Sequence, residues 1–434
     1  MSDLGRYPYG TVAGRILDAA LDAVEPEART LEALHLSQGQ LDVGGQALPL
    51  HADCRIWLVA VGKAAAAMAR ACCTALGSRL TAGVVITKQP VPPWVDADPR
   101  LHGLHGAHPV PDARSVAAGQ AVLDLVARAG PHDVVVVALS GGASSLMVAP
   151  APGIAGTQLF DLGAALVGSG ASIEEINLVR ACLDDIKAGG LAQRAQPASV
   201  VTLVLSDVVG GPVEVVGSGP TLGRPPLRSQ ALAILADHGL VVPPGIARFL
   251  ADPPAPEARA PAPPGPAIVL ADNQTAVEAA LVRARQLGWA ATREPELCGE
   301  AQTQGRAWGE RLAAARPQQP TVFIAGGETT VRVRGGGRGG RNQTLALAAM
   351  EALHESAGRM LVTLATDGED GPTDAAGAVV TADSLGRARA RGLQPSLHLH
   401  DDDAYPLFDA LDDLLRIGST GTNVCDLVLG LVRP

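Results

Sequence analysis

The chain has 434 residues, of which 47% are apolar, 18% charged and 3% aromatic, and its net charge is −10. This length exceeds what one core supports, so two or three domains are expected. The acidic balance argues against a nucleic-acid surface, and apolar runs such as 134–139 are far too short to cross a membrane. Six cysteines without metal-ligand spacing and an N-terminus without a signal-peptide pattern predict a cytoplasmic protein.

The first half of the chain alternates strand and helix patterns. Residues 11–34 have apolar positions at helical spacing, which predicts one N-terminal helix. Helices are also expected at 63–76, at about 113–129 with Asp112 as the N-cap, and at 176–194. Buried, β-branched strands are expected at 55–61, 82–87, 133–139 and 200–205. Such alternation predicts a doubly wound parallel sheet.

A proline-rich stretch, 251–267, is interpreted as a linker, so the predicted domains are 1–265 and 266–434. The second domain is expected to begin with a strand at Ile268. Helices near 276–287, 300–315 and 343–353 and strands at 321–325 and 361–366 should follow. An alternating strand at 329–333 after a short turn indicates a hairpin, which predicts a mixed sheet.

Ligands of open α/β sheets bind at the carboxyl ends of the strands. Lys63 follows the strand 55–61 in a first helical turn, where its charge opposes the helix dipole, and this favours an anion site over a solvated lysine. Asp207, after the strand 200–205, could orient a hydroxyl group or a metal, or could only cap a helix. A glycine turn after the strand 133–139 frees backbone N–H groups for an anion, although such turns are common. Its candidate binding residues are Ser140, Gly141, Gly142 and Ser144.

Three polar residues of the predicted helix 176–194 share one face, since their spacings are three and seven. They are Asn177, Arg180 and Lys187. This face could hold a substrate carboxylate or phosphate, and a solvated face is the alternative.

The segment 332–342 is the densest basic, glycine-rich stretch of the chain, and it precedes a predicted helix. Arg338, Arg341 and Asn342 are its candidate anion ligands, and Glu328, in the turn before it, is a further candidate. The glycines at 335, 337 and 340 match a dinucleotide fingerprint. That interpretation is rejected because the preceding strand alternates valine with arginine and no acidic residue follows at a second strand end.

The loop 366–374 carries four carboxylates in nine residues, which suits Mg²⁺, although a polar turn is the alternative. Asp367 and Asp374 are the candidate ligands. Basic loops in both halves, an acidic loop and the lack of a redox motif favour phosphoryl transfer, which mainly needs positioning and charge neutralisation.

Eight motifs in order along the chain resemble the class II glycerate kinases, the glycerate 2-kinase family with a C-terminal MOFRL domain. They are VGKAAAAMA (61–69), HPVPD (108–112), LSGGASSLM (139–147), INLVR…IKAGGLA (176–192), LSDVVG…VGSGPT (205–221), GGRNQT (339–344), ATDGEDGPTDAAGA (365–378) and STGTNVCDL (419–427). The chain departs from the family pattern at Gly210-Gly211, at Thr344 and in the stretch 180–184.

The resemblance implies a Rossmann-like first domain, a mixed α/β second domain with the MOFRL region at about 320–428, and an active site in the interdomain cleft. It implies phosphorylation of D-glycerate at the 2-hydroxyl by ATP and Mg²⁺, which gives 2-phosphoglycerate and ADP. It also implies that Lys63 and Arg341 are essential. We hypothesise that both cations hold and neutralise the transferring phosphoryl group. Asp207 would orient or deprotonate the glycerate hydroxyl, and Asp367 or Asp374 would help to bind Mg²⁺.

Two other functions stay open at this point: an NAD(P)H-dependent hydroxypyruvate reductase and a non-catalytic binding protein for small hydroxy acids. The sequence also leaves open whether the protein is a monomer or a homodimer, and which loop binds ATP and which binds glycerate.

Overall fold

The computed structural model describes residues 2–223, 227–252 and 265–434. The chain divides into unit 1, Met1–Glu25 with Ala271–Pro434, and unit 2, Pro26–Leu270. The stretch 251–267, interpreted as a linker, lies mostly outside the described residues. The N-terminal residues differ from the expected division, since helix α1 (Gly10–Asp22) packs against α12 (Asn273–Gln286) and Thr422 Oγ1 donates to Val24 O at 2.9 Å.

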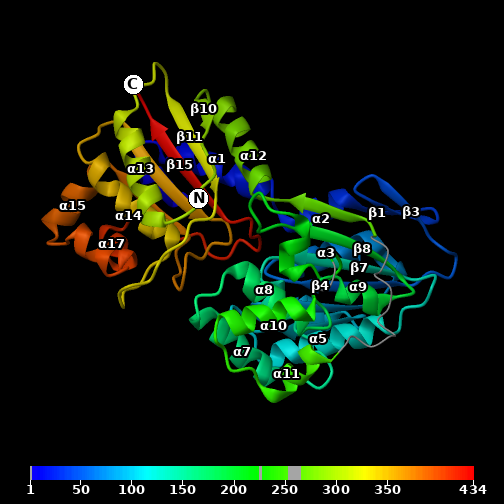
Figure 1. The fold of residues 1–434 in the computed structure, drawn as a ribbon. Coiled ribbons are helices and arrows are strands. Elements are labelled where there is room, and N and C mark those ends of the chain that lie inside the picture. The colour runs from blue at the N-terminus through cyan, green and yellow to red at the C-terminus, as the bar shows by residue number, and fades with distance from the viewer. Residues whose placement is uncertain (1, 224–226, 253–264) are drawn as a thin grey trace. The chain divides into compact units, whose positions relative to one another are not determined.

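Unit 2 is built on a six-stranded sheet of order β6-β5-β4-β7-β8-β9 (Figure 1). The strands β6 to β8 pair in parallel. The bounds are β4 Ile56–Val61, β5 Leu80–Thr87, β6 Leu101–His105, β7 Val134–Ser140, β8 Ser199–Leu205 and β9 Ala267–Ala271. Every residue of β4 and β7 is buried, as expected of central strands covered on both faces. Val61 is level with both Ile86 and Leu139, so these strands end at one edge of the sheet.

The helices of unit 2 cover this sheet and form a second apolar cluster beside it. Alternate residues of β4 pack with α5, α3 contacts β4 and β5, and α7, α8, α10 and α11 share a separate core. The bounds are α2 Pro26–Ala33, α3 Ala65–Leu76, α4 Pro93–Ala97, α5 Ala113–Val126, α6 Ala143–Leu146, α7 Gly156–Gly168, α8 Ile173–Cys182, α9 Gly190–Ala195, α10 Arg228–Asp237 and α11 Pro244–Ala251. A small antiparallel sheet, β1 Leu34–Ser37, β2 Gln40–Val43 and β3 Gln46–Pro49, lies between α2 and β4 in the chain.

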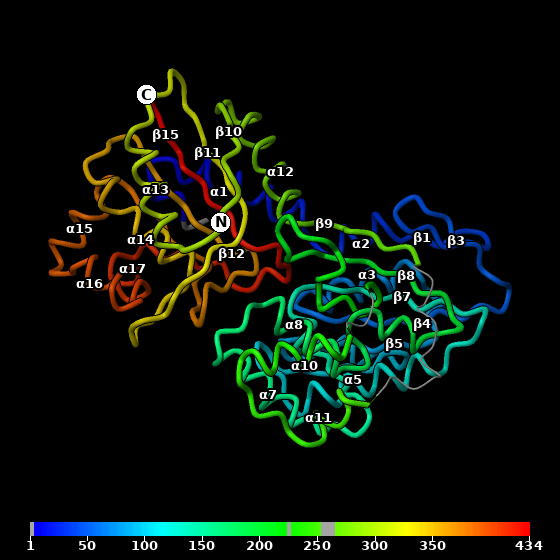
Figure 2. The backbone as a smooth tube through the Cα atoms, in the orientation of Figure 1, coloured from blue at the N-terminus to red at the C-terminus, as the bar shows by residue number. Residues whose placement is uncertain are grey.

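Unit 1 contains a mixed six-stranded sheet of order β10-β11-β15-β12-β13-β14. In this sheet only β10 and β11 pair in parallel, and β15 lies antiparallel between β11 and β12. The tube trace shows β15 running beside β11 (Figure 2). The strands are β10 Ala290–Arg293, β11 Thr321–Gly327, β12 Arg359–Ala365, β13 Gly377–Thr381, β14 Leu414–Leu415 and β15 Asp426–Val432. The remaining helices are α13 Ala301–Ala314, α14 Arg341–Leu353, α15 Ser384–Ala390, α16 Pro395–His400 and α17 Ala404–Leu411.

These two sheets confirm the predicted fold class, a parallel α/β sheet followed by a mixed one. Three expected elements were wrong, and a fourth, the strand at 268, is present but lies in the other sheet. The helix expected at 11–34 is two helices, since α1 ends before Pro26 begins α2. The helix expected at 176–194 is also two, α8 and α9. The strand at 268 is β9, at the edge of the unit 2 sheet. Residues 329–333 form only a bridge at Thr330, because β11 is already paired on both sides.

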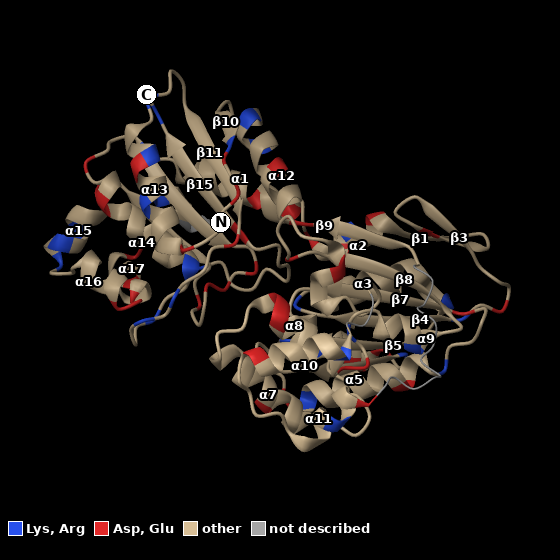
Figure 3. Cartoon of the chain, in the orientation of Figure 1, with Lys and Arg blue, Asp and Glu red and all other residues tan. Residues whose placement is uncertain are grey.

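In the view of Figure 3, lysines and arginines are interspersed with aspartates and glutamates along the described parts of both units. Within those residues, no helix is long and apolar enough to span a bilayer.

Candidate active site

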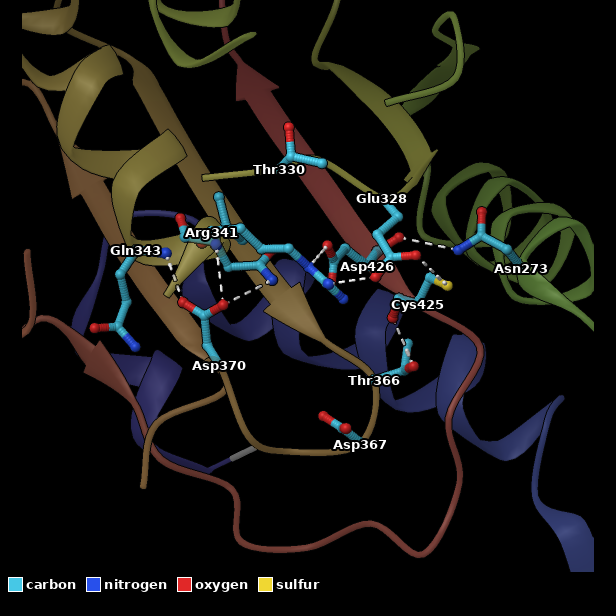
Figure 4. Close-up of polar contacts among 12 residues, drawn as sticks. Asn273, Glu328, Thr330, Arg341, Gln343, Thr366, Asp367, Asp370, Cys425 and Asp426 are labelled. Carbon is cyan, nitrogen blue, oxygen red and sulfur yellow. Dashed lines mark hydrogen bonds and ion pairs between the residues drawn. The ribbon is translucent and has the colours of Figure 1, made fainter. Parts of the chain in front are cut away.

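Arg341 begins α14 and lies at the edge of the unit 1 sheet where three strands meet (Figure 4). Its Nε donates to Asp426 Oδ2 at 2.6 Å and its Nη2 to Asp426 Oδ1 at 3.1 Å, while Nη1 donates to Glu328. Asp426 is the first residue of β15 and is level with Gly327 of β11 and Ala365 of β12. The three strands therefore fix the buried acceptor, and the acceptor fixes the guanidinium group.

The two carboxylates that hold Arg341 differ in burial. Asp426 is only 1% exposed, and burial raises its pKa against the opposing effect of the Arg341 charge. The Glu328 side chain is 46% exposed. Burial would lower the pKa of Arg341, but the charges of Asp426 and Glu328 outweigh it and the pKa is raised. Arg341 is thus permanently charged, with one buried partner and one that an incoming anion can replace.

Asp370 occupies the N-terminus of α14, where an external anion was expected. Its carboxylate accepts the backbone N–H groups of Asn342 at 3.0 Å and Gln343 at 2.8 Å. Burial raises the pKa of Asp370 to about 7. Asn342 is only 2% exposed, and its side-chain amide also donates to Asp370. In this structure these donors bind the protein's own carboxylate, and Asn342 as a ligand of an external anion stays a prediction.

Arg338 and Asp374 belong to a different group of contacts, around Tyr405 of α17. The Arg338 guanidinium lies 4.1 Å from the Tyr405 ring centroid, and the Tyr405 hydroxyl donates to Asp374 Oδ1 at 2.6 Å. Arg416 donates to Asp374 Oδ2 at 3.3 Å. The hydrogen bond from Tyr405, with the Arg416 charge, lowers the pKa of Asp374. This carboxylate therefore has two protein partners of its own.

Asp367 follows β12 on the loop beside the Arg341 pair (Figure 4). Its Oδ1 accepts the backbone N–H of Glu369 at 3.1 Å. Among the described residues, the one group of three His, Cys, Asp or Glu whose donor atoms lie close enough to share an ion is the exposed set His51, Asp53 and His132. The structure therefore does not bring Asp367 and Asp374 together in a preformed metal cluster.

In unit 2, the turn that carries Lys63 is bound to the neighbouring glycine turn. Gly62 has a φ of +124°, and a Cβ there would lie 2.2 Å from Ser140 Oγ, so the turn requires glycine. The backbone N–H of Lys63 donates to Gly141 O at 2.9 Å, and Ala64 N donates to Ser140 Oγ at 3.0 Å. Ser140 is fully buried. In this structure Ser140 holds the lysine turn, and its role as a substrate ligand stays a prediction.

The Lys63 side chain runs beside Gly142. A Cβ at Gly142 would lie in ordinary contact with Lys63 Cγ, at 3.7 Å, but only 3.0 Å from His108 Cδ2, so a side chain at this position would crowd His108. Ser144 Oγ hydrogen-bonds to Ser218 Oγ at 2.8 Å, which joins this turn to the 3-10 helix Val213–Ser218. His108 and Ser218 lie in sequence motifs but were not expected to contact these turns.

The three polar residues expected on one helix face are separated by the end of α8. Asn177 and Arg180 lie on α8, whereas Lys187 lies beyond it and is 4% exposed. Lys187 Nζ lies 3.1 Å from Asp184 Oδ2 and donates to Ser144 O at 2.9 Å. Lys187 therefore supports the Ser144 turn. Asp207 follows β8 at the same edge of the sheet as Lys63, and its role stays a prediction.

The sequence reasoning missed two acidic residues of the unit 1 site, the Arg341 acceptor Asp426 and the α14 cap Asp370. Asp426 opens the apolar run 427–432, and such a carboxylate next to a strand start was the available signal. Asp370 was noticed only as one of four acids in its loop. A fixed arginine in one unit and a lysine-bearing glycine turn in the other supply the positioned positive charge that phosphoryl transfer requires, so the site fits a phosphotransferase.

Comparisons with known proteins agree with this class. A domain of unknown function, DUF4147, matches residues 12–251, and the MOFRL family matches residues 321–426. A D-glycerate 2-kinase of Thermotoga maritima is 39% identical over 386 residues, which are 87% of this chain and 91% of the relative. The crystal structure of a glycerate kinase from T. maritima superposes with a TM-score of 0.84 at 34% identity, covering 97% of this chain and 99% of that one.

A protein of Agrobacterium vitis, provisionally named a hydroxypyruvate reductase, is 36% identical over 430 residues, 96% of this chain and 93% of its own. The geometry here gives no support to a dinucleotide fingerprint, since no strand runs directly into the glycines 335–340 and Asp370 occupies the following helix terminus. The chain belongs to the glycerate kinase family whose members combine a DUF4147 domain with a MOFRL domain.

Proposed function

We propose that this protein transfers the γ-phosphoryl group of ATP to the 2-hydroxyl of D-glycerate, with Mg²⁺, to give 2-phosphoglycerate and ADP. The observation that carries the proposal is the guanidinium of Arg341, fixed on buried Asp426, in a chain that is 39% identical to a D-glycerate 2-kinase. Phosphoryl transfer depends chiefly on positioned positive charge, which this pair supplies.

Arg341 would neutralise charge on phosphate oxygens by exchanging its outer partner. The cluster as it stands has one cation and two carboxylates, a net charge of 1 − 2 = −1, so a phosphate group would replace Glu328 rather than add to it. Glu328 is therefore assigned as the resting partner of Arg341 and not as a phosphate ligand. Asp426 would keep the guanidinium in place during this exchange.

Lys63 would supply a second positive charge to the reacting phosphates. Its backbone is fixed by Gly141, while a lysine side chain is a flexible point charge that can follow a moving group. Asp207, at the same edge of the unit 2 sheet, is our candidate to orient the glycerate hydroxyl.

Asp367 is the better of the two candidate ligands for Mg²⁺. Magnesium uses one or two carboxylates together with waters and phosphate oxygens, so a single strand-end carboxylate fits its requirements. Asp374 fits poorly, because Tyr405 and Arg416 already bind both of its oxygens. When bound, the ion would neutralise negative charge on the nucleotide phosphates.

Two assays on one preparation test this proposal. ADP release from ATP and MgCl₂ should depend on D-glycerate, and hydroxypyruvate should cause no oxidation of NADH or NADPH. Oxidation of either nicotinamide without ADP release would favour the reductase. Binding of D-glycerate with neither reaction would favour the non-catalytic binding protein.

A further inference from the structure

Unit 2 contains a cavity of about 250 Å³ between α7 and α8, beside the turn that contains Ser144. Most of its lining is apolar, including Val148, Leu159, Phe160 and Val167. Leu159 and Val148 are buried, whereas Val167 is 60% exposed. The apolar lining continues from the buried residues to Val167, so a ligand has an apolar route into the cavity.

Arg180 is the unpaired charge of this cavity. Its side chain lines the cavity from α8 and is half-buried, and burial lowers its pKa. Within the described residues it makes no hydrogen bond or ion pair, and a Cβ added at Gly163 of α7 would lie 3.5 Å from Arg180 Nη2, so α7 passes close to the guanidinium without giving it a partner. A half-buried guanidinium without a partner is unfavourable, and an anion would remove that cost.

The other charged groups of the cavity are already paired with each other. Lys187 Nζ lies 3.1 Å from Asp184 Oδ2, and Asp184 Oδ1 also accepts the backbone N–H of Ile186 at 2.9 Å. Two cations and one carboxylate leave a net charge of 2 − 1 = +1. This single charge matches a monoanion such as a carboxylate better than a phosphate dianion.

The hydroxyl groups of the cavity also have protein partners. Ser144 Oγ hydrogen-bonds to Ser218 Oγ at 2.8 Å, and Ser145 Oγ donates to Pro109 O at 2.8 Å. A polyhydroxy acid would therefore bury hydroxyl groups against Leu159 and Phe160, and each unpaired hydroxyl is disfavoured there. The apolar lining of the cavity therefore favours a ligand whose carboxylate is attached to an apolar chain.

We propose that this cavity binds a monocarboxylate with a short aliphatic chain, with the carboxylate on Arg180. At about 30 Å³ for each water-sized group, 250 Å³ holds about eight heavy atoms. A carboxylate accounts for three of them, which leaves about five chain carbons, as in 4-methylpentanoate. The site does not depend on the proposed kinase activity, since it needs neither ATP nor Lys63.

The test is calorimetric titration of the full chain with 4-methylpentanoate. We expect saturable binding that Arg180→Gln weakens roughly 10- to 100-fold, as the loss of a charge-assisted hydrogen bond requires. Ala164→Phe, on the lining of α7, should also weaken binding while leaving the charge in place. Arg248→Gln removes an exposed arginine on α11 and should leave binding unchanged.

Repeating the titration with D-glycerate present shows whether the monocarboxylate occupies the pocket of the phosphoryl acceptor or a separate effector site. Competition would make the cavity part of the acceptor pocket, and independent binding would make it an effector site; both support the proposal. Absence of binding at millimolar ligand, unchanged affinity in Arg180→Gln, or tighter binding of inorganic phosphate would overturn it. Turnover of D-glycerate is measured separately, so failure of the kinase proposal would be recognised as such.

Discussion

The pair formed by Arg341 and Asp426 can be tested with Asp426→Asn, because the same unit contains a matched pair. Arg387 Nη2 lies 2.7 Å from Asp413 Oδ2, and side-chain exposures are 30% and 2%, against 31% and 2% for Arg341 and Asp426. Burial raises the pKa of both carboxyl groups. Asp413 also accepts from the Tyr7 hydroxyl at 2.9 Å and from Ser384 Oγ at 3.4 Å, so Asp413→Asn should lose at least as much stability as Asp426→Asn.

The expected loss of stability follows from the contacts that asparagine removes. The amide keeps one acceptor for Arg341 but places a donor opposite the other N–H, so one charge-assisted hydrogen bond, worth about 1.5–3 kcal/mol, disappears. The partly buried guanidinium also loses its inner charge, and removing one member of a buried pair costs about 3–5 kcal/mol in total. Since Glu328 remains, we expect a value near the lower end, about 3 kcal/mol, for Asp426→Asn.

Activity should distinguish the two variants, because the variant with the lower activity should not be the one with the lower stability. Without Asp426 the guanidinium is free to move, and displacement of a catalytic group by about 1 Å costs roughly 10²-fold in rate. We expect kcat for ADP release to fall by about that factor in Asp426→Asn and to stay near wild type in Asp413→Asn. Urea unfolding gives the stability of each. Equal kcat in both variants would refute the role given to Arg341.

Three further predictions concern single side chains. Lys63→Ala should lower kcat by about 10²–10³ with an unchanged circular dichroism spectrum, and near wild-type turnover would remove Lys63 from the mechanism. Asp367→Asn should raise the Mg²⁺ concentration needed for half-maximal activity, whereas Asp374→Asn should not; the reverse order would exchange their roles. The pKa of Asp370 is raised from 3.8 to about 7 by burial, so the stability that its proton contributes is present below about pH 4 and is lost as the pH rises through 7. About three pH units at 1.36 kcal/mol each give roughly 4 kcal/mol, and urea unfolding should show Asp370→Asn gaining on wild type by up to this amount between pH 4 and 7; parallel pH profiles would contradict it.

Local sequence patterns determined much of the fold. The buried strands 133–139 and 200–205 were predicted because continuous β-branched runs suit a sheet covered on both faces. The Asp112 cap was also predicted, and its side chain accepts the N–H of Arg114 at 2.8 Å. The predicted helix 176–194 was too long, since α8 ends at Cys182. Nothing in the periodicity of the sequence marks this end, after which Lys187 pairs with Asp184.

The errors at the sites come from contacts between residues distant in the sequence. Arg341 and Asp426 are 85 positions apart, and only the insertion of β15 between β11 and β12 brings them together. The α14 terminus looked like an anion site because its N–H groups and arginines are visible in the sequence. Its occupant, Asp370, comes from another loop. The strand expected at 329–333 failed for a similar reason, because pairing of β11 on both sides is a property of the whole sheet.

The most direct test of the central claim is phosphorus NMR of one incubation of the protein with ATP, MgCl₂ and D-glycerate. The account predicts that ADP and 2-phosphoglycerate appear in equal amounts, and that the Asp426→Asn variant forms both about 10²-fold more slowly. Formation of 3-phosphoglycerate would contradict the assignment of the 2-hydroxyl as the acceptor. Loss of ATP to ADP and inorganic phosphate, with no phosphorylated glycerate, would contradict the kinase itself.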